Sequence, residues 1–142
     1  MIEITDKPIR PQDFIDKVSR EHNGAITVFM GTVRDFADDR RLSHMEYDAY
    51  GEMAEKTLSD IVEEAKARWH TQEIVLAHRV GRVELKDISV IIAVGTPHRA
   101  QAFEACRYII DRIKEKAPIW KKEVDSEGRG EWVKGQVPAA SG

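Results

Sequence analysis

Two long segments with helical periodicity, set among short β-branched segments, limit this chain to a mixed α and β fold. In residues 53–69, apolar residues recur at spacings of three and four: Ala54, Leu58, Ile61, Ala65 and Trp69. A second stripe of this kind comprises Ala102, Phe103, Cys106, Ile109, Ile110 and Ile113. Stripes with this spacing are typical of helices that pack one face against a sheet. We therefore predict two long helices that cover a sheet.

Glycine and proline mark both ends of the second helix. Gly95 ends the preceding strand, Thr96 is the candidate N-cap, and Pro97 suits the first turn because its missing N–H costs nothing there. Pro118 disfavours helical geometry at Ala117, so we expect the helix to end there.

The remaining pattern predicts strands and one short helix. The expected strands are 25–33, 42–50, 74–80, 88–94, 119–124 and 131–133. We expect the first of them to be buried, residues 81–87 to be a connection and the charged segment 35–43 to be a mobile loop. A short helix over Pro11–Val18 should turn Phe14, Ile15 and Val18 inward. Together these elements predict a two-layer α+β domain.

Length and composition exclude several classes of protein. The 142 residues suit one domain, expected over 1–136, with a flexible tail at 137–142. A net charge of 22 − 25 = −3 argues against nucleic-acid binding, which needs a basic surface. No apolar run approaches the ~20 residues that cross a bilayer, and the first residues lack signal-peptide features. A single cysteine excludes an internal disulfide. We expect a reduced, cytoplasmic protein without membrane contact.

Positive charge is concentrated near the second helix. Between His98 and Lys122 there are seven Lys and Arg against three Asp and Glu, so this segment carries +4 and the rest of the chain −7. Such a local field favours a small anionic ligand or an acidic partner. For Arg107, Arg112 and Lys116 we prefer the simpler interpretation of a solvated helix face.

Three smaller groups of basic residues are more specific candidates for anion binding. His98 and Arg99 lie in the expected first helical turn, where free N–H groups and the helix dipole favour an anion; the alternative is two exposed residues after a proline. Arg34 ends a strand and could fork onto a phosphate, although a salt bridge with Asp35 or Asp38 is the simpler alternative.

Lys114 and Lys121 bracket the stop at Pro118, so a chain reversal would bring them together. Two neighbouring ammonium groups lower each other's pKa, which prepares a lysine for catalysis. The alternative is an ordinary solvated lysine cluster.

Other chemistry is not indicated. The histidines lack metal-ligand spacing, and the glycine-rich nucleotide motifs are absent. Cys106 lies on an apolar helix stripe, so we expect a core thiol with a raised pKa. Any sulfur chemistry would need imported sulfur, and we predict neither a metal nor a cofactor.

A helix also limits what one copy of the chain can do alone. His98 and Lys114 are 16 residues apart, which is ~24 Å along a continuous helix. If both serve one small ligand, two copies must share the site, and function would require a homodimer.

Five motifs occur together and in order in this chain. They are Gly24-Ala25…Phe29-x-Gly31-x-Val33-Arg34, Tyr47-x-Ala49-Tyr50-x-x-Met53-Ala54, His78-Arg79-Val80-Gly81, Val94-x-x-Pro97-His98-Arg99 and Lys114-x-x-Ala117-Pro118-Ile119-Trp120-Lys121-Lys122-Glu123. From about Ile4 to Trp132 the chain resembles the large, catalytic subunit of molybdopterin synthase. The resemblance implies an α/β-hammerhead fold and a sulfur transferase of molybdenum cofactor biosynthesis.

In that family, cyclic pyranopterin monophosphate receives two sulfurs and becomes molybdopterin. The resemblance implies that the sulfur arrives as a thiocarboxylate on the C-terminal glycine of a small ubiquitin-like subunit, and that a central homodimer of large subunits forms a heterotetramer. It also implies roles for matched positions. Lys114 is the principal catalytic residue and Lys121 its partner, and the substrate-binding residues are Thr32, Val33, Arg34, His98, Arg99, Lys114, Lys121, Lys122 and Glu123, with His98 and Arg99 given by the opposite subunit.

Two alternatives from other classes stay open on the sequence. The chain could be a non-enzymatic adaptor that binds a ubiquitin-like tail, in which case Lys114 and His98 would be replaceable. It could also be a phosphate-ester hydrolase that uses His98 and turns over without a sulfur donor.

Overall fold

The computed structural model describes residues 1–134, so the tail expected at 137–142 lies outside the described residues. Three helices and nine strands are described. In chain order they are β1 (Ile2–Thr5), α1 (Pro11–Val18), β2 (Ala25–Thr32), β3 (Phe36–Ala37), β4 (Arg40–Ala49), α2 (Gly51–Trp69), β5 (Ile74–Arg79), β6 (Gly81–Glu84), β7 (Ile88–Thr96), α3 (Arg99–Lys116), β8 (Ile119–Asp125) and β9 (Trp132–Lys134). The predicted α+β fold, with two long helices on a mostly antiparallel sheet, is confirmed.

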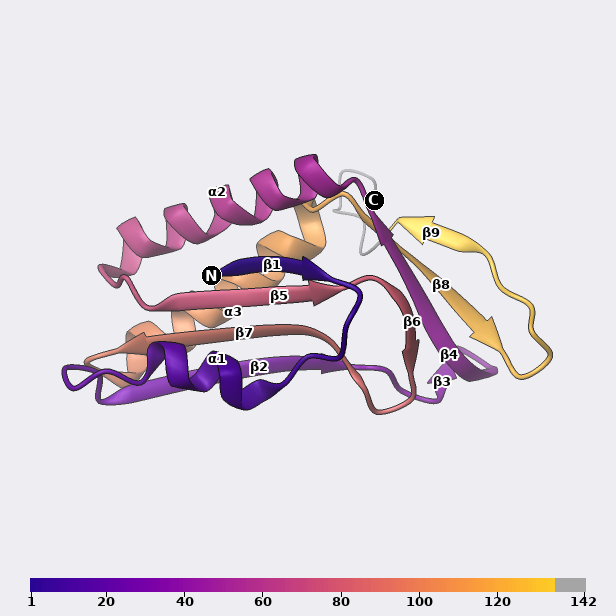
Figure 1. Cartoon of the computed structure of the whole chain (residues 1–142), viewed down its shortest axis with the longest axis horizontal. Coiled ribbons are helices and arrows are strands. Elements are labelled where there is room, and N and C mark those ends of the chain that lie inside the picture. The colour runs from indigo at the N-terminus through magenta and orange to yellow at the C-terminus, as the bar shows by residue number, and fades with distance from the viewer. Residues whose placement is uncertain (135–142) are drawn as a thin grey trace.

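The first sheet has the strand order β1-β5-β7-β2, in which only β1 runs parallel to its neighbour. The long helices α2 and α3 cover one face, and α1 covers the other (Figure 1). The larger core lies under α2 and α3 and includes Leu58, Leu76, Ile92 and Ile109, all almost fully buried. Their burial is the main stabilisation of this layer, because apolar area removed from water contributes ~25 cal/mol per Å².

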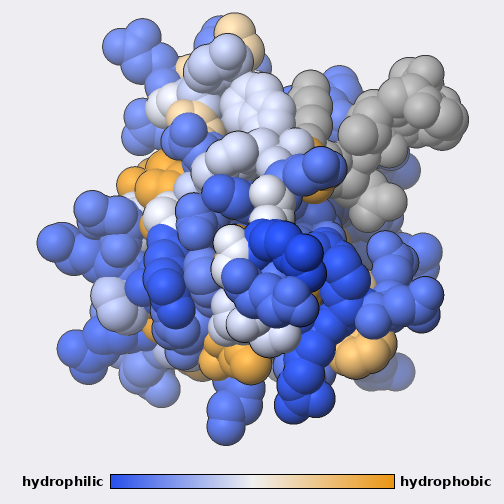
Figure 2. Space-filling view, turned by 90° about the vertical axis from the view of Figure 1, so that its right-hand side faces the viewer, coloured by the Kyte–Doolittle hydropathy of each residue, from blue (hydrophilic) through white to orange (hydrophobic). Residues whose placement is uncertain are grey.

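The second sheet joins β3, β4, β8 and β9 in that order, with β6 also paired to β4. Its strands run steeply across the direction of the first sheet and form one end of the molecule (Figure 1). A small core of Val33, Ala37, Leu42, Met45 and Val83 fixes this end to the rest of the chain. Figure 2 looks onto this end and shows a mostly hydrophilic surface with small, separate apolar patches.

Strand β2 is not the buried strand that its sequence indicates. It lies at the edge of the first sheet, and Ile26 and Met30 are 41% and 45% exposed. Phe103, expected on the buried stripe of α3, is 63% exposed, and Ala105 takes a core position instead. The exposed apolar side chains of β2 and α3 are thus available to another surface.

The charged segment 35–43 forms a hairpin rather than a loop. Phe36 and Ala37 pair with Arg41 and Arg40, and the turn places Asp38 in the left-handed region, with φ at 55°. Strands β1 and β6 were also not expected from the sequence. Both are four residues long and form by pairing with distant strands β5 and β4.

The N-terminal end of α3 differs from the prediction, and its C-terminal end agrees with it. Strand β7 continues through Thr96, whose hydroxyl donates to the carbonyl of His98, so Thr96 is not the cap. His98 is the N-cap residue and Arg99 the first helical residue. The helix ends at Lys116 with Ala117 as C-cap, as Pro118 predicted. Within residues 1–134, no helix has the length and apolar character needed to span a membrane.

Candidate active site

A pocket of about 290 Å³ lies where the second sheet meets the end of α3. The end of β2 contributes Thr32 to its wall, and the segment that follows contributes Val33 and Arg34. Lys114 comes from the last turn of α3, and Lys121 and Glu123 come from β8; the rest of the lining is Phe29, Gly31, Leu42, Met45, Tyr47, Ser89 and Val90. Six of the sequence-predicted site residues therefore share one pocket.

The chain reversal at Pro118 brings the two lysines together, as the sequence predicted. Ala117 closes α3 with a hydrogen bond from its N–H to the carbonyl of Ile113, at 3.0 Å. Strand β8 then begins at Ile119 and pairs antiparallel with β4. Because side chains alternate along a strand, Lys121 and Glu123 point to the same side, toward Lys114.

The surroundings of Lys114 disfavour its charged form. Its side chain reaches solvent at the pocket mouth, yet the surrounding protein removes enough water to lower its pKa below the usual value. The positive charge of Lys121 lowers this pKa further. An ammonium group that is poorly compensated in this way binds an incoming anion more strongly than a solvated lysine does.

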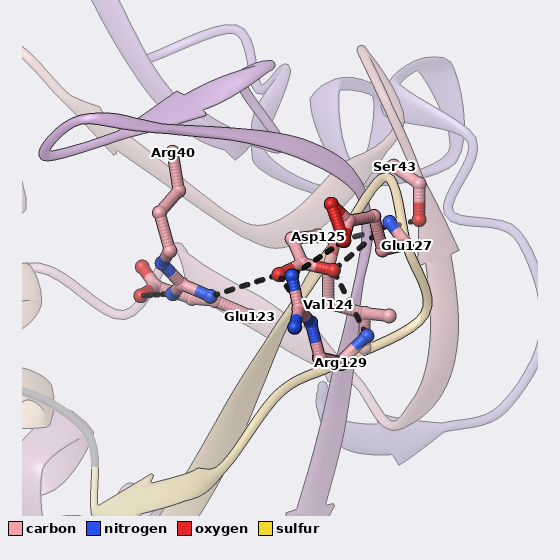
Figure 3. A network of polar contacts seen from close by, with 7 residues as sticks. All are labelled: Arg40, Ser43, Glu123, Val124, Asp125, Glu127 and Arg129. Carbon is pink, nitrogen blue, oxygen red and sulfur yellow. Dashed lines mark hydrogen bonds and ion pairs between the residues drawn. The ribbon is translucent and has the colours of Figure 1, made fainter.

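The carboxylate of Glu123 is shared between two cations rather than given to one. Lys121 Nζ lies 3.9 Å from Glu123 Oε2, and Arg40 Nη2 donates to Glu123 Oε1 at 3.3 Å. Figure 3 shows Arg40 between Glu123 and Asp125. Because Arg40 competes for this carboxylate, Glu123 only partly neutralises the lysine pair, and the pocket keeps a positive field.

Asp125 anchors the outer part of this network. It accepts hydrogen bonds from the backbone N–H groups of Glu127 and Arg129, at 3.0 and 2.9 Å (Figure 3). These bonds, with the one from Arg129 foremost, hold the pKa of Asp125 below its ordinary value. The turn after β8 is thereby fixed, and with it the position of Arg40 opposite Glu123.

A narrower slot of about 30 Å³ adjoins the pocket and shares its two lysines. His78 and Tyr47 line it, with their rings in edge-to-face contact at a centroid distance of 5.1 Å. Burial lowers the pKa of His78 to about 4, and the charge of Lys114 acts in the same direction, so the imidazole is neutral at pH 7. Neither residue was expected from the sequence to belong to the site. Their positions in two of the five motifs were the only signal.

Three predicted site residues lie away from this pocket. His98 and Arg99 are at the far end of α3, where His98 lines a different pocket with Arg68, His70 and Glu104. Lys122 points to the other side of β8 and lies 5.8 Å from the ring centroid of Trp132. The separation of His98 from Lys114 agrees with the helix-length argument.

Arg34 is exposed, and no carboxylate of residues 1–134 pairs with it. The alternative interpretation, a salt bridge with Asp35 or Asp38, is wrong, because neither aspartate pairs with Arg34 and Asp35 pairs with Arg41 at 3.7 Å instead. The guanidinium at the pocket rim is therefore free to bind an anion.

Cys106 is the only cysteine of the chain and lies in the core under α3. Burial raises its thiol pKa to about 11, as the sequence predicted, so almost none of it is thiolate at neutral pH. Across the described part of the chain, no group of three His, Cys, Asp or Glu is placed to hold a metal ion.

Comparison with known proteins gives concordant matches. The family model described as MoaE protein matches residues 4–116. The molybdopterin synthase catalytic subunit of Thermoplasma volcanium is 47% identical over 131 residues, which is 92% of this chain and 96% of that protein.

Solved structures agree with the sequence comparison. The crystal structure of molybdopterin synthase from Staphylococcus aureus has a TM-score of 0.87 and 40% identity, and the match covers 92% of this chain and 95% of that one. A complex of subunits 1 and 2 of molybdopterin-converting factor from Helicobacter pylori contains the same fold, with a TM-score of 0.76 and 22% identity over 96% of this chain and 92% of that one.

Proposed function

The chain belongs to the MoaE family, and from this membership we propose that it is the catalytic subunit of a molybdopterin synthase. It is a sulfur transferase that converts cyclic pyranopterin monophosphate to molybdopterin. The sulfur comes from the C-terminal thiocarboxylate of a small ubiquitin-like carrier subunit, and the protein works in the cytoplasm.

One observation carries the chemistry of this proposal. Arg34, Lys114 and Lys121 line a single pocket, while the chain's one thiol is buried with a raised pKa. The pocket therefore offers positive charge for a phosphate and a thiocarboxylate but no thiol of its own. A reaction in which the sulfur is delivered by a partner fits both facts.

The residues divide between binding and catalysis. Thr32, Val33 and Arg34 hold the phosphorylated substrate at the rim, with Glu123 orienting Lys121. Lys114 neutralises the incoming thiocarboxylate, and Lys121 stabilises the charge that develops on the phosphate leaving group. Hydrolysis of the spent acyl group then frees the carrier. Lys122, which faces the other side of β8, is left for a contact outside the pocket.

His98 and Arg99 join the site from a second copy of the chain. The edge strand β2 leaves Ile26 and Met30 exposed, and Phe103 of α3 is exposed as well. Large apolar side chains on an edge strand and the adjacent helix favour burial against another protein. A homodimer that buries them would be the centre of a heterotetramer with one carrier subunit per large subunit.

The decisive experiment is reconstitution from pure components. The protein is mixed with a thiocarboxylated carrier subunit and cyclic pyranopterin monophosphate, and the dithiolene product is measured by mass spectrometry. We expect product only with the thiocarboxylated carrier. A complete reaction mixture that yields no dithiolene contradicts the proposal.

The same mixture separates the two alternatives. A phosphate-ester hydrolase would open the cyclic phosphate by hydrolysis without the carrier. An adaptor would bind the carrier but not the pterin, so a calorimetric titration with the cyclic substrate alone distinguishes it. Phe103→Glu, which changes an exposed side chain, should convert the dimer to a monomer in light scattering.

A further inference from the structure

The narrow slot beside the pocket contains a buried histidine that the proposed function leaves without a role. His78 lies at the end of β5, 6% exposed, and shares the slot with Tyr47, Lys114 and Lys121. Most of the remaining lining is apolar, including Val90, Ile110, Ile113, Ala117 and Ile119. Burying an imidazole among such side chains costs free energy unless its polar atoms are used.

The hydrogen bonding of His78 fixes its tautomer. Nδ1 lies 2.9 Å from the carbonyl oxygen of Arg79, and a carbonyl only accepts, so Nδ1 carries the proton and donates it. Nε2 is then the nitrogen with the lone pair. Within residues 1–134, the bond from Nδ1 is the one hydrogen bond of the His78 ring, and Nε2 makes none.

The groups around the ring leave one natural donor for that lone pair. Tyr47 of β4 meets His78 edge-to-face, and Lys121 of β8 is already paired with Glu123. Lys114 of α3 is the lysine whose charge acts on His78. An uncharged acceptor has an advantage here, because it orients an ammonium group without cancelling the charge that must bind an anion.

We propose that His78 is a positioning residue that offers Nε2 as a neutral acceptor to the ammonium group of Lys114. The inference rests on the proposed function, because it assigns His78 to the orientation of the catalytic lysine. The interaction between the two side chains can be measured without substrate.

The first test compares His78→Phe with His78→Gln. Phenylalanine keeps a ring of similar shape but no acceptor, whereas the glutamine amide oxygen can replace Nε2. Losing an acceptor for a charged donor should lower kcat about tenfold or more, with little change in KM. It should also shift the titration of Lys114 to lower pH, followed by NMR of ¹³C-labelled lysine in the protein alone. His78→Gln should keep kcat and the Lys114 titration close to those of the unaltered protein. His44→Gln, at a buried histidine outside the pocket, should change neither kcat nor the Lys114 titration.

The second test uses the unaltered protein and does not depend on how well a variant folds. Nitrogen NMR at pH 7 should show His78 neutral, with the proton on Nδ1. A charged ring, a proton on Nε2, or an unshifted Lys114 titration in a folded His78→Phe would overturn the inference. A wild-type protein that makes no dithiolene would reject the proposed function instead, so the two failures are distinguishable.

Discussion

Replacing Lys114 by alanine should abolish most activity without weakening the fold. The ammonium group lies at the pocket mouth, where it faces the incoming anion and where surrounding protein and Lys121 already disfavour its charge. Removing one preorganised charged group from such a site costs about 2.7–4 kcal/mol in the transition state, a loss of about 10²–10³ in kcat. The side chain is exposed and not part of the core, so no packing is lost.

The effect on stability has a definite sign. The pKa of Lys114 is lower in the folded protein than in the unfolded chain, so the unfolded chain takes up the proton first as pH falls. The charged lysine therefore destabilises the fold on the acid side of the ordinary lysine pKa. Lys114→Ala should have an equal or higher melting temperature at pH 7, and its free energy of unfolding should differ from that of the unaltered protein by no more than about 0.5 kcal/mol.

The assay pairs Lys114→Ala with Lys116→Ala, which removes an exposed lysine of the same helical turn that does not line the pocket. Dithiolene formation, melting temperature and molecular mass are measured for both variants. Full activity of Lys114→Ala refutes the catalytic assignment. A large drop in its melting temperature, or an equal loss of activity in Lys116→Ala, refutes the argument that the effect is local.

Three further changes follow from other parts of the structure. Arg34→Ala should weaken binding of the cyclic phosphate about tenfold in calorimetry, without a change in melting temperature, because Arg34 has no ion-pair partner in residues 1–134; unchanged affinity would exclude it from the phosphate site. Gly95→Ala should lower the free energy of unfolding in urea by about 1–3 kcal/mol, because a Cβ at this position would lie 2.6 Å from the carbonyl oxygen of Val18. Gly51→Ala should leave it unchanged, because a Cβ there meets nothing within 4 Å. Equal effects of the two variants would contradict this account of the packing. Cys106→Ala should keep its sulfur-transfer activity, because a thiol with a pKa of about 11 is not a nucleophile at neutral pH; a hundredfold loss would show that the thiol participates.

Local signals in the sequence predicted the helices and their stops well. Pro118 ends α3, and the reversal it imposes is what unites Lys114 with Lys121, so this part of the candidate site was predictable. The turn at Asp38 was not, because a charged hairpin and a charged loop have the same composition. Short strands such as β1 also escape prediction, since they form by pairing with residues more than seventy positions away.

Exposure is the property that the sequence predicted least well. The pattern of β2 is that of a buried strand, and Phe103 continues an apolar stripe, yet both face outward in one copy of the chain. An apolar pattern reports that residues are to be covered, not what covers them. His78 was missed for a related reason: its role depends on which side chains meet it in the slot, and these come from four separate elements.

Helix α3 has a consequence for genetics as well as for chemistry. Its 18 residues span ~27 Å and hold His98 and Lys114 rigidly at opposite ends. In the proposed dimer, two inactive variants, His98→Ala and Lys114→Ala, would complement each other: a mixed dimer assembles one intact site from the unaltered end of each helix. Random mixing in equal amounts should restore about a quarter of the wild-type sites. Deleterious alleles at the two ends of this helix would then rescue one another within a single cell.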